Sequence, residues 1–202
     1  MIDIVFPKDN EKEFIRIAEK LNLDGLCFVY DTPKDISSFQ KGTKLKLSVG
    51  VLCKPEDVKR YTGKYLTLMR APEDQSRIRS IIEKAKPDIL FDLEFSRKND
   101  FIHHRASGLN HVLATLARQK GVKIGIDFSR VIGARREERA VYLGRITQNI
   151  QFARKFKFDV VCASFTDNSM NLRAKEDIDS FLRCVGLFNP KKNKYGENFE
   201  YE

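Results

Sequence analysis

Short runs of β-branched and apolar residues alternate with segments of helical periodicity along most of this chain, and this alternation limits its fold more than any other feature. A strand followed by a helix, repeated many times, is typical of a parallel sheet covered by helices. Seven runs predict strands, at Ile2–Phe6, Gly25–Tyr30, Leu45–Leu52, Tyr65–Met69, Ile89–Leu93, Lys123–Phe128 and Asp159–Ala163. The remaining periodic segments predict helices at Glu11–Leu21, Lys34–Phe39, Pro55–Tyr61, Glu73–Lys84, Gly108–Lys120, Glu137–Phe156 and Lys175–Leu187.

This pattern predicts an α/β fold that resembles a TIM barrel. No linker separates the strand–helix units, which indicates one barrel domain over residues 1–188. A full barrel of this type has eight strands, so the seven legible strands predict an incomplete or distorted barrel. A doubly wound parallel sheet is the alternative. Residues 189–202 combine Pro190, a lysine-rich run and three glutamates without any apolar period, and this predicts a flexible tail.

The cysteines and the first residues of the chain help to predict its location in the cell. The four cysteines are far apart and form no pair with zinc-ligand spacing, so we expect reduced thiols in the core, at Cys27, Cys53, Cys162 and Cys184. The first residues lack the basic region and apolar run of a signal peptide. No apolar stretch approaches the ~18 residues of a membrane span. We therefore expect a cytoplasmic protein without membrane contact.

The positive charge is concentrated in one quarter of the chain. The net charge is +9, and residues 95–145 hold eleven Lys and Arg against four Asp and Glu. Loops after neighbouring parallel strands meet at one edge of a sheet, where α/β folds bind ligands. Guanidinium groups match phosphate in shape and charge, so the cluster predicts a surface for a polyanion, with a merely solvated basic face as the alternative. The seven cations that follow the fifth and sixth predicted strands are Arg97, Lys98, Arg105, Arg130, Arg135, Arg136 and Arg139.

Three carboxylates near the ends of the same strands allow the alternative hypothesis that the chain is an enzyme. Asp92 and Glu94 would share one face of the fifth strand, and Asp127 lies in the sixth. With a histidine they could hold a metal ion, as in a metal-dependent phosphoesterase barrel. Hydrolytic barrels with two metals need several histidines on their strands, whereas all three histidines here lie between residues 103 and 111. We favour pairing of these carboxylates with the arginines, and a barrel that binds a small phosphorylated metabolite is a third hypothesis.

The segment around these histidines is the most specific motif of the chain. It reads His104-Arg-Ala-Ser-Gly-Leu-Asn-His111, followed by an apolar helix. Ser107 followed by Gly108 predicts the start of that helix, where backbone N–H groups would face an anion beside Arg105. The motif resembles the hallmark of the thirty-kilodalton protein subunit family of ribonuclease P, which in archaea is called protein component 3. The motif residues are Ser107, Gly108, Asn110 and His111.

Further blocks in the second half of the chain support the resemblance. Lys123–Ser129 is similar to the family's next strand, Arg145–Ser164 to its long basic helix and final strand, and Arg173–Ile178 to the start of its last helix. Before Asp92 the chain matches only in its strand–helix pattern. Ser164-Phe165-Thr166 departs from the small Ser-Gly-type pair that the family tends to have there, so we assign no function to that loop by analogy.

The resemblance implies a TIM-barrel-like protein without its own active site. Such a protein binds the catalytic RNA of ribonuclease P, pairs with a small ferredoxin-like protein subunit, and helps the RNA to remove the 5′ leader from precursor tRNA with Mg²⁺. Other ribonuclease P proteins are further implied partners, and precursor tRNA is an indirect one. We therefore predict no catalytic residue and no bound metal or cofactor in this chain, with Mg²⁺ used by the RNA.

Overall fold

The structure is a computed structural model that describes residues 1–95, 99–100 and 102–187. The predicted tail at 189–202 lies outside the described residues and stays a prediction. Arg97 and Lys98 also lie outside the described residues.

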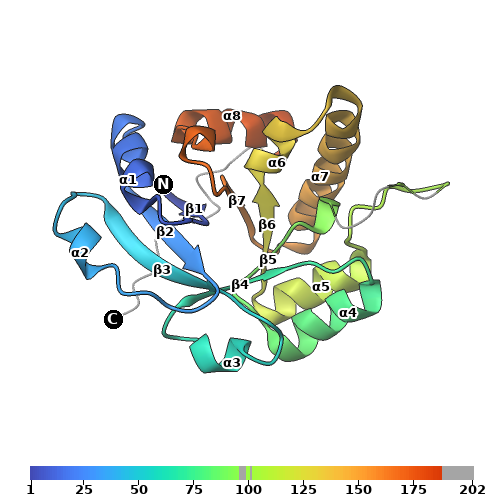
Figure 1. Ribbon diagram of the computed structural model, residues 1–202. Helices are drawn as coiled ribbons and strands as arrows, with labels where there is room; N and C mark the ends of the chain where they lie inside the picture. Colours follow the sequence, from blue (N-terminus) through green and yellow to red (C-terminus); the bar gives the residue numbers. More distant parts are fainter. Residues whose placement is uncertain (96–98, 101, 188–202) are drawn as a thin grey trace.

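Seven parallel strands form one sheet in sequence order, each paired with the next along the chain. Their apolar runs bury most of their side chains, although β3 is only partly buried. They are β1 (Ile2–Val5), β2 (Gly25–Tyr30), β3 (Lys46–Leu52), β4 (Leu66–Arg70), β5 (Ile89–Phe91), β6 (Lys123–Asp127) and β7 (Val160–Ala163). The confirmed strand count and order match an incomplete barrel (Figure 1).

The two ends of the sheet meet, which excludes the doubly wound alternative. The Phe165 N–H donates to the Ile4 carbonyl at 2.8 Å, and the Phe6 N–H donates to the Thr166 carbonyl at 2.8 Å. Val5 and Thr166 form a parallel bridge. These contacts lie just beyond β7, so the barrel is nearly closed by the segment that follows its last strand.

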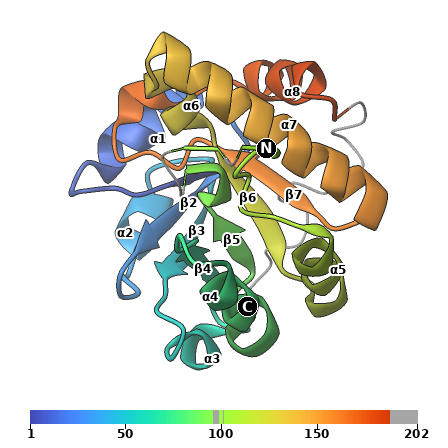
Figure 2. The same cartoon turned by 90° about the vertical axis from the view of Figure 1, so that its right-hand side faces the viewer.

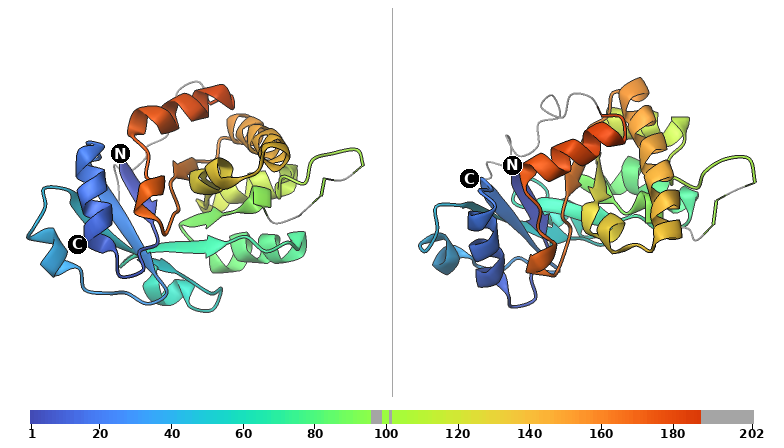
Figure 3. Two further views of the ribbon diagram at one scale, coloured as in Figure 1. Left: turned by 45° about the horizontal axis from the view of Figure 1, so that its top comes forward. Right: turned by 90° about the horizontal axis from the view of Figure 1, so that it is seen from above.

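Helices surround the strands (Figure 3). The longest, α7, lies obliquely across the outer face beside β7, with α5 and α8 to either side of it (Figure 2). A π-helical turn at Ile81–Ala85 continues α4. In the described part of the chain, no helix is both long and apolar enough to cross a membrane. The helices are α1 (Glu11–Lys20), α2 (Ser37–Gln40), α3 (Val58–Tyr61), α4 (Gln75–Ser80), α5 (His111–Lys120), α6 (Phe128–Gly133), α7 (Arg136–Phe156) and α8 (Lys175–Cys184).

The apolar side chains form two clusters on opposite faces of the sheet. The larger one lies between strands and helices. The smaller one fills the barrel interior, where Phe91 stacks on Phe165 with ring centroids 4.9 Å apart, and Phe6 lies 5.8 Å from Phe91. Three of the four cysteines are buried, as expected, but Cys184 is exposed on α8. The prediction of a core thiol was wrong for Cys184, because it falls on the outer face of that helix.

Several predicted boundaries were wrong. Helix α2 begins at Ser37 rather than at Lys34, α3 begins at Val58 rather than at Pro55, and α8 ends at Cys184 rather than at Leu187. Two further errors fall beside the predicted site. Strand β5 ends two residues early because Asp92 has a φ of 67°, which is not an extended conformation. Helix α5 starts at His111 rather than at Gly108. Gly108 has a φ of 80°, and a Cβ there would lie 2.8 Å from the Leu93 carbonyl oxygen. Asn110 caps the helix instead, since its side chain accepts a hydrogen bond from the Leu113 N–H at 2.9 Å.

The short helix α6 was not predicted. It has six residues and no room for a helical apolar stripe. Its N-terminus follows β6 directly, and Asp127 provides the cap. As a result, Arg130 lies in a helix, whereas the sequence pattern placed it in a loop.

Candidate functional site

The carboxyl ends of the strands surround a polar pocket of about 740 Å³. Barrels of this type bind their ligands at this end. The pocket takes residues from the segments after β1, β2, β4, β6 and β7. Its cations are Lys8, Lys34, Arg70 and Arg130. We call it the mouth pocket.

Asp92 holds two of these cations. Its Oδ2 lies 2.8 Å from Arg70 Nε and 3.2 Å from Arg130 Nη1. The Asp92 side chain is 2 % exposed, whereas those of Arg70 and Arg130 are 59 % and 44 % exposed. Burial raises the pKa of Asp92, and the charges of Arg130 and Arg70 oppose that rise. One buried carboxylate therefore anchors two arginines whose remaining donors face solvent.

Aromatic rings fix the same two guanidinium groups. Arg70 lies over the Phe91 ring at 5.3 Å from its centroid, and Arg130 lies over the Phe95 ring at 4.5 Å. An ion pair together with a cation–π contact restrains each side chain to one orientation. Arg70 ends a strand and Arg130 lies on α6, so both are presented from regular structure.

Asp127, beside these arginines, serves as a helix cap. Its Oδ1 accepts hydrogen bonds from the Arg130 N–H at 3.0 Å and the Ser129 hydroxyl at 2.8 Å. Burial raises the pKa of Asp127 to about 7, and the nearby charge of Asp92 adds to the rise. Its geometry thus stabilises α6, which carries Arg130.

Glu94 belongs to a separate, fully buried network. Its Oε1 accepts a hydrogen bond from Asn149 Nδ2 at 2.7 Å. Burial raises the pKa of Glu94 to about 7. Arg145, also fully buried, donates to the Glu94 carbonyl at 2.8 Å and pairs with Asp100 at 2.7 Å. This network ties the segment after β5 to helix α7.

The same network anchors the Ser-Gly-Leu-Asn-His motif. Asn149 Nδ2 also donates to the Ser107 carbonyl at 2.9 Å. Ser107 is buried, Gly108 makes the turn, and Asn110 caps α5, while His111 is exposed at the first position of that helix. The motif therefore forms a rigid turn between β5 and α5.

The predicted cations separate into different surroundings. Arg105 is exposed, and its guanidinium lies against α7 at Gly144, where any larger side chain would overlap it. Arg135 and Arg136 are exposed at the beginning of α7. Arg139 is exposed as well, but its guanidinium donates to three carbonyls at the end of α6, those of Val131, Ile132 and Ala134. Arg97 and Lys98 lie outside the described residues.

The carboxylates do not converge as the alternation of the fifth strand predicted. Asp92 turns to Arg70 and Arg130, whereas Glu94, in a 3₁₀ turn at Leu93–Phe95, turns to Asn149. The prediction of one shared face was wrong because Asp92 leaves the extended conformation. In the ranges that the structure describes, no group of three His, Cys, Asp or Glu side chains is arranged to hold a metal ion.

Two residues of the site, Arg70 and Asn149, were not predicted from the sequence. Arg70 is the charged residue that ends the otherwise uncharged strand Leu66–Arg70, and that position is a usable signal for a ligand-facing side chain. Asn149 sits inside a basic helix, and its partner Glu94 is 55 residues away in sequence. No local pattern marks it.

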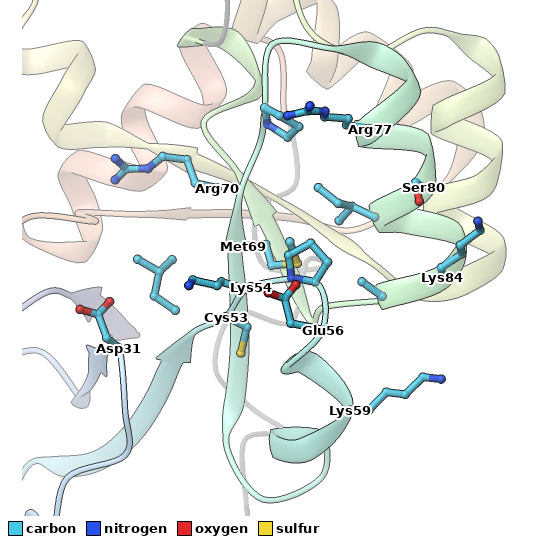
Figure 4. Close-up of a pocket in the computed structure, with 15 residues that line it drawn as sticks. Asp31, Cys53, Lys54, Glu56, Lys59, Met69, Arg70, Arg77, Ser80 and Lys84 are labelled. Carbon is cyan, nitrogen blue, oxygen red and sulfur yellow. The ribbon is translucent and has the colours of Figure 1, made fainter.

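A second, larger groove of about 1020 Å³ lies between the β3–α3 and β4–α4 segments (Figure 4). Its lining includes the apolar side chains of Leu52, Met69 and Ile81. Arg70 borders both the groove and the mouth pocket, and in Figure 4 it extends away from Met69 and Lys84. The cations around the groove are Lys54, Lys59, Arg70, Arg77 and Lys84.

Comparisons with known proteins agree along most of the chain. The family model described as RNase P subunit p30 matches residues 2–195. Ribonuclease P protein component 3 of Methanocaldococcus jannaschii is 26 % identical over 189 residues, which cover 87 % of this chain and 78 % of that protein. The protein of the same name from Methanothermobacter thermautotrophicus is 24 % identical over 195 residues, 89 % of this chain and 77 % of the relative. For that of Methanococcus maripaludis strain C7, the match covers 63 % of this chain and 52 % of the relative, at 28 % identity.

A solved structure gives the same result in three dimensions. One chain of a cryo-EM structure of archaeal ribonuclease P with mature tRNA superposes with a TM-score of 0.78 and 25 % sequence identity. The superposition covers 95 % of this chain and 86 % of that chain. The similarity therefore includes the half before Asp92, which the sequence motifs did not reach.

Proposed function

The chain belongs to the RNase P subunit p30 family, and we propose that it binds the catalytic RNA of ribonuclease P and assists removal of the 5′ leader from precursor tRNA. The match of the family model from residue 2 to residue 195 carries this proposal. The similar chain in an archaeal ribonuclease P solved with mature tRNA supports it.

The exposed arginines supply the means of binding. Arg105, Arg130, Arg135 and Arg136 present guanidinium groups around α6 and the beginning of α7. Phosphate contacts provide most of the affinity of proteins for nucleic acids, and they read no base sequence. The proposed role is to neutralise and position RNA phosphates, so that the RNA folds at a lower Mg²⁺ concentration.

In this proposal the chemistry belongs to the RNA. The chain contributes no catalytic residue and binds no cofactor of its own, and the Mg²⁺ is used by the RNA. The proposed partners are the ribonuclease P RNA, a small ferredoxin-like protein subunit and other ribonuclease P proteins, with precursor tRNA contacted indirectly. A cytoplasmic location is part of the same proposal.

Reconstituted cleavage tests the proposal. Precursor tRNA is incubated at limiting Mg²⁺ with the cognate ribonuclease P RNA and the small partner subunit, with and without this chain. A large increase in the rate of leader removal on addition, with no cleavage by the proteins alone, is the expected result. An unchanged rate would contradict the proposal and would mean that this chain shares only its fold with the ribonuclease P subunit.

A further inference from the structure

We propose that the mouth pocket binds a phosphate monoester of nucleotide size, with its phosphate held between Arg70 and Arg130. This site goes beyond the proposed function, because it takes one phosphorylated group into the barrel end and does not track an RNA backbone. Three features of the pocket favour this ligand: the anchoring of the two arginines, the volume and walls of the pocket, and the placement of its other charges.

The two guanidinium groups are already ordered for a shared anion. Asp92 forms ion pairs with Arg70 Nε and Arg130 Nη1 through a single oxygen, Oδ2. A guanidinium has five N–H donors in a fixed fork, so most donors of both arginines remain for a ligand. Because each side chain is also fixed by an aromatic ring, little rotamer freedom is lost when the ligand binds.

The size and walls of the pocket favour a phosphate that carries a larger group. A volume of about 740 Å³ lies within the range of pockets for small organic ligands and exceeds what a free phosphate fills. Phe6, which is partly buried, contributes an aromatic wall, and the buried rings of Tyr30 and Phe165 border the pocket behind it. Thr32 and Ser129 contribute hydroxyls. Aromatic faces together with a few hydroxyls suit a nucleoside better than an aliphatic chain.

Most of the other charges of the pocket already have partners, several of which line the same pocket. Lys8 pairs with Asp167 at 2.7 Å, and Lys34 lies over the Tyr30 ring. Asp127 caps α6. Asp31, the remaining carboxylate of the lining, is exposed to solvent. The arginine pair anchored on Asp92 is therefore the strongest centre for a doubly charged anion in this pocket.

The direct test measures binding of adenosine 5′-monophosphate to the full chain by titration calorimetry. We expect saturable binding at one site, competition by inorganic phosphate, and no binding of adenosine. Arg70→Ala and Arg130→Ala should each raise the dissociation constant at least about tenfold, since each removes charged hydrogen bonds. Each variant leaves Asp92 with one arginine, and circular dichroism checks that it folds. Arg79→Ala is the matched control, because Arg79 is an exposed arginine on α4 that pairs with Glu83 outside the pocket.

A second experiment distinguishes two sources of the phosphate monoester, a free mononucleotide and the 5′ end of an RNA strand. A short single-stranded oligoribonucleotide is compared with a 5′-phosphate and with a 5′-hydroxyl end. Tighter binding of the phosphorylated strand, lost in Arg70→Ala, would identify an RNA end as the ligand even if the free mononucleotide bound weakly. Binding of the free mononucleotide without any difference between the strands would identify a small molecule.

The inference fails if neither experiment shows phosphate-dependent binding, or if Arg70→Ala and Arg79→Ala behave alike. Stimulation of precursor tRNA cleavage by the wild-type chain is measured in parallel. Intact stimulation alongside a failed phosphate test would overturn the mouth site and leave the ribonuclease P role standing. Phosphate binding without stimulation of cleavage would support the mouth site and overturn the ribonuclease P role.

Discussion

Replacing Glu94 by glutamine tests how much a buried carboxyl group costs the fold at neutral pH. Glu94 is fully buried. Its Oε1 accepts from Asn149, and within the described residues its Oε2 has no hydrogen-bond partner. Burial raises the pKa of Glu94 to about 7. A glutamate in an unfolded chain has a pKa of about 4.3, so the folded chain holds this proton more tightly.

The sign of the pH effect follows from that difference. Between about pH 4.3 and pH 7 the folded chain binds more protons than the unfolded chain, so the free energy of unfolding falls as pH rises through this window. At roughly 1.4 kcal/mol per pKa unit, the Glu94 contribution is at most about 4 kcal/mol. Asp127, with a pKa raised to about 7, adds a loss of the same sign.

Urea unfolding at pH 5 and pH 8 measures this loss in the wild type, in Glu94→Gln and in a control. Glu94→Gln should be more stable than the wild type at pH 8, by up to about 4 kcal/mol, and should show a smaller loss between the two pH values. Glu83→Gln is the control, because Glu83, in the π-helical turn that continues α4, pairs with exposed Arg79 and this pair is worth only about 0.5 kcal/mol. An equal pH dependence in the wild type and Glu94→Gln would refute the reasoning.

Three further substitutions test the turn and the helix ends by urea unfolding. Gly108→Ala places a Cβ 2.8 Å from the Leu93 carbonyl oxygen at a positive φ and should cost about 1–3 kcal/mol; a loss no larger than that of Gly121→Ala, a positive-φ site with open space, would contradict this. Asn110→Ala removes the cap of α5 and should cost about 1 kcal/mol, and an unchanged stability would show that the cap contributes nothing. Arg139→Ala removes three hydrogen bonds to carbonyls at the end of α6 and should cost about 1–3 kcal/mol, whereas a loss equal to that of exposed Arg136→Ala would contradict its anchoring role.

The sequence predicts the strands of this barrel well because each is a short apolar run. The run Leu26–Tyr30, for example, is buried throughout, and strands that are covered on both faces read as continuous apolar segments. The seven strands and their order followed from these runs and from the helices between them. The closure of the barrel did not, since it depends on backbone contacts between Ile4 and Phe165, at opposite ends of the chain.

The site was predicted in part. Of the described predicted cations, Arg130 lines the mouth pocket, and the pairing of Asp92 with arginine was confirmed. The RNA contacts of the predicted cations stay a prediction. Local sequence patterns did not predict the conformation of residues whose hydrogen-bond or ion-pair partners lie far away in the sequence. Asp92 adopts a positive φ with its carboxylate on Arg70 and Arg130, and Asn149 is placed by its hydrogen bond to Glu94. The spacing of residues along the sequence predicts neither arrangement.

The salt dependence of RNA binding tests the central claim most directly. The affinity of the full chain for ribonuclease P RNA is measured over a range of salt concentrations for the wild type and for the double variant Arg135→Ala, Arg136→Ala. The control is Lys12→Ala, Arg16→Ala, which removes two exposed cations from α1. If the arginines at the beginning of α7 contact phosphates, the slope of log affinity against log salt should become shallower by about 2 in the first variant and stay near the wild-type value in the control. Equal slopes in all three proteins would contradict the account.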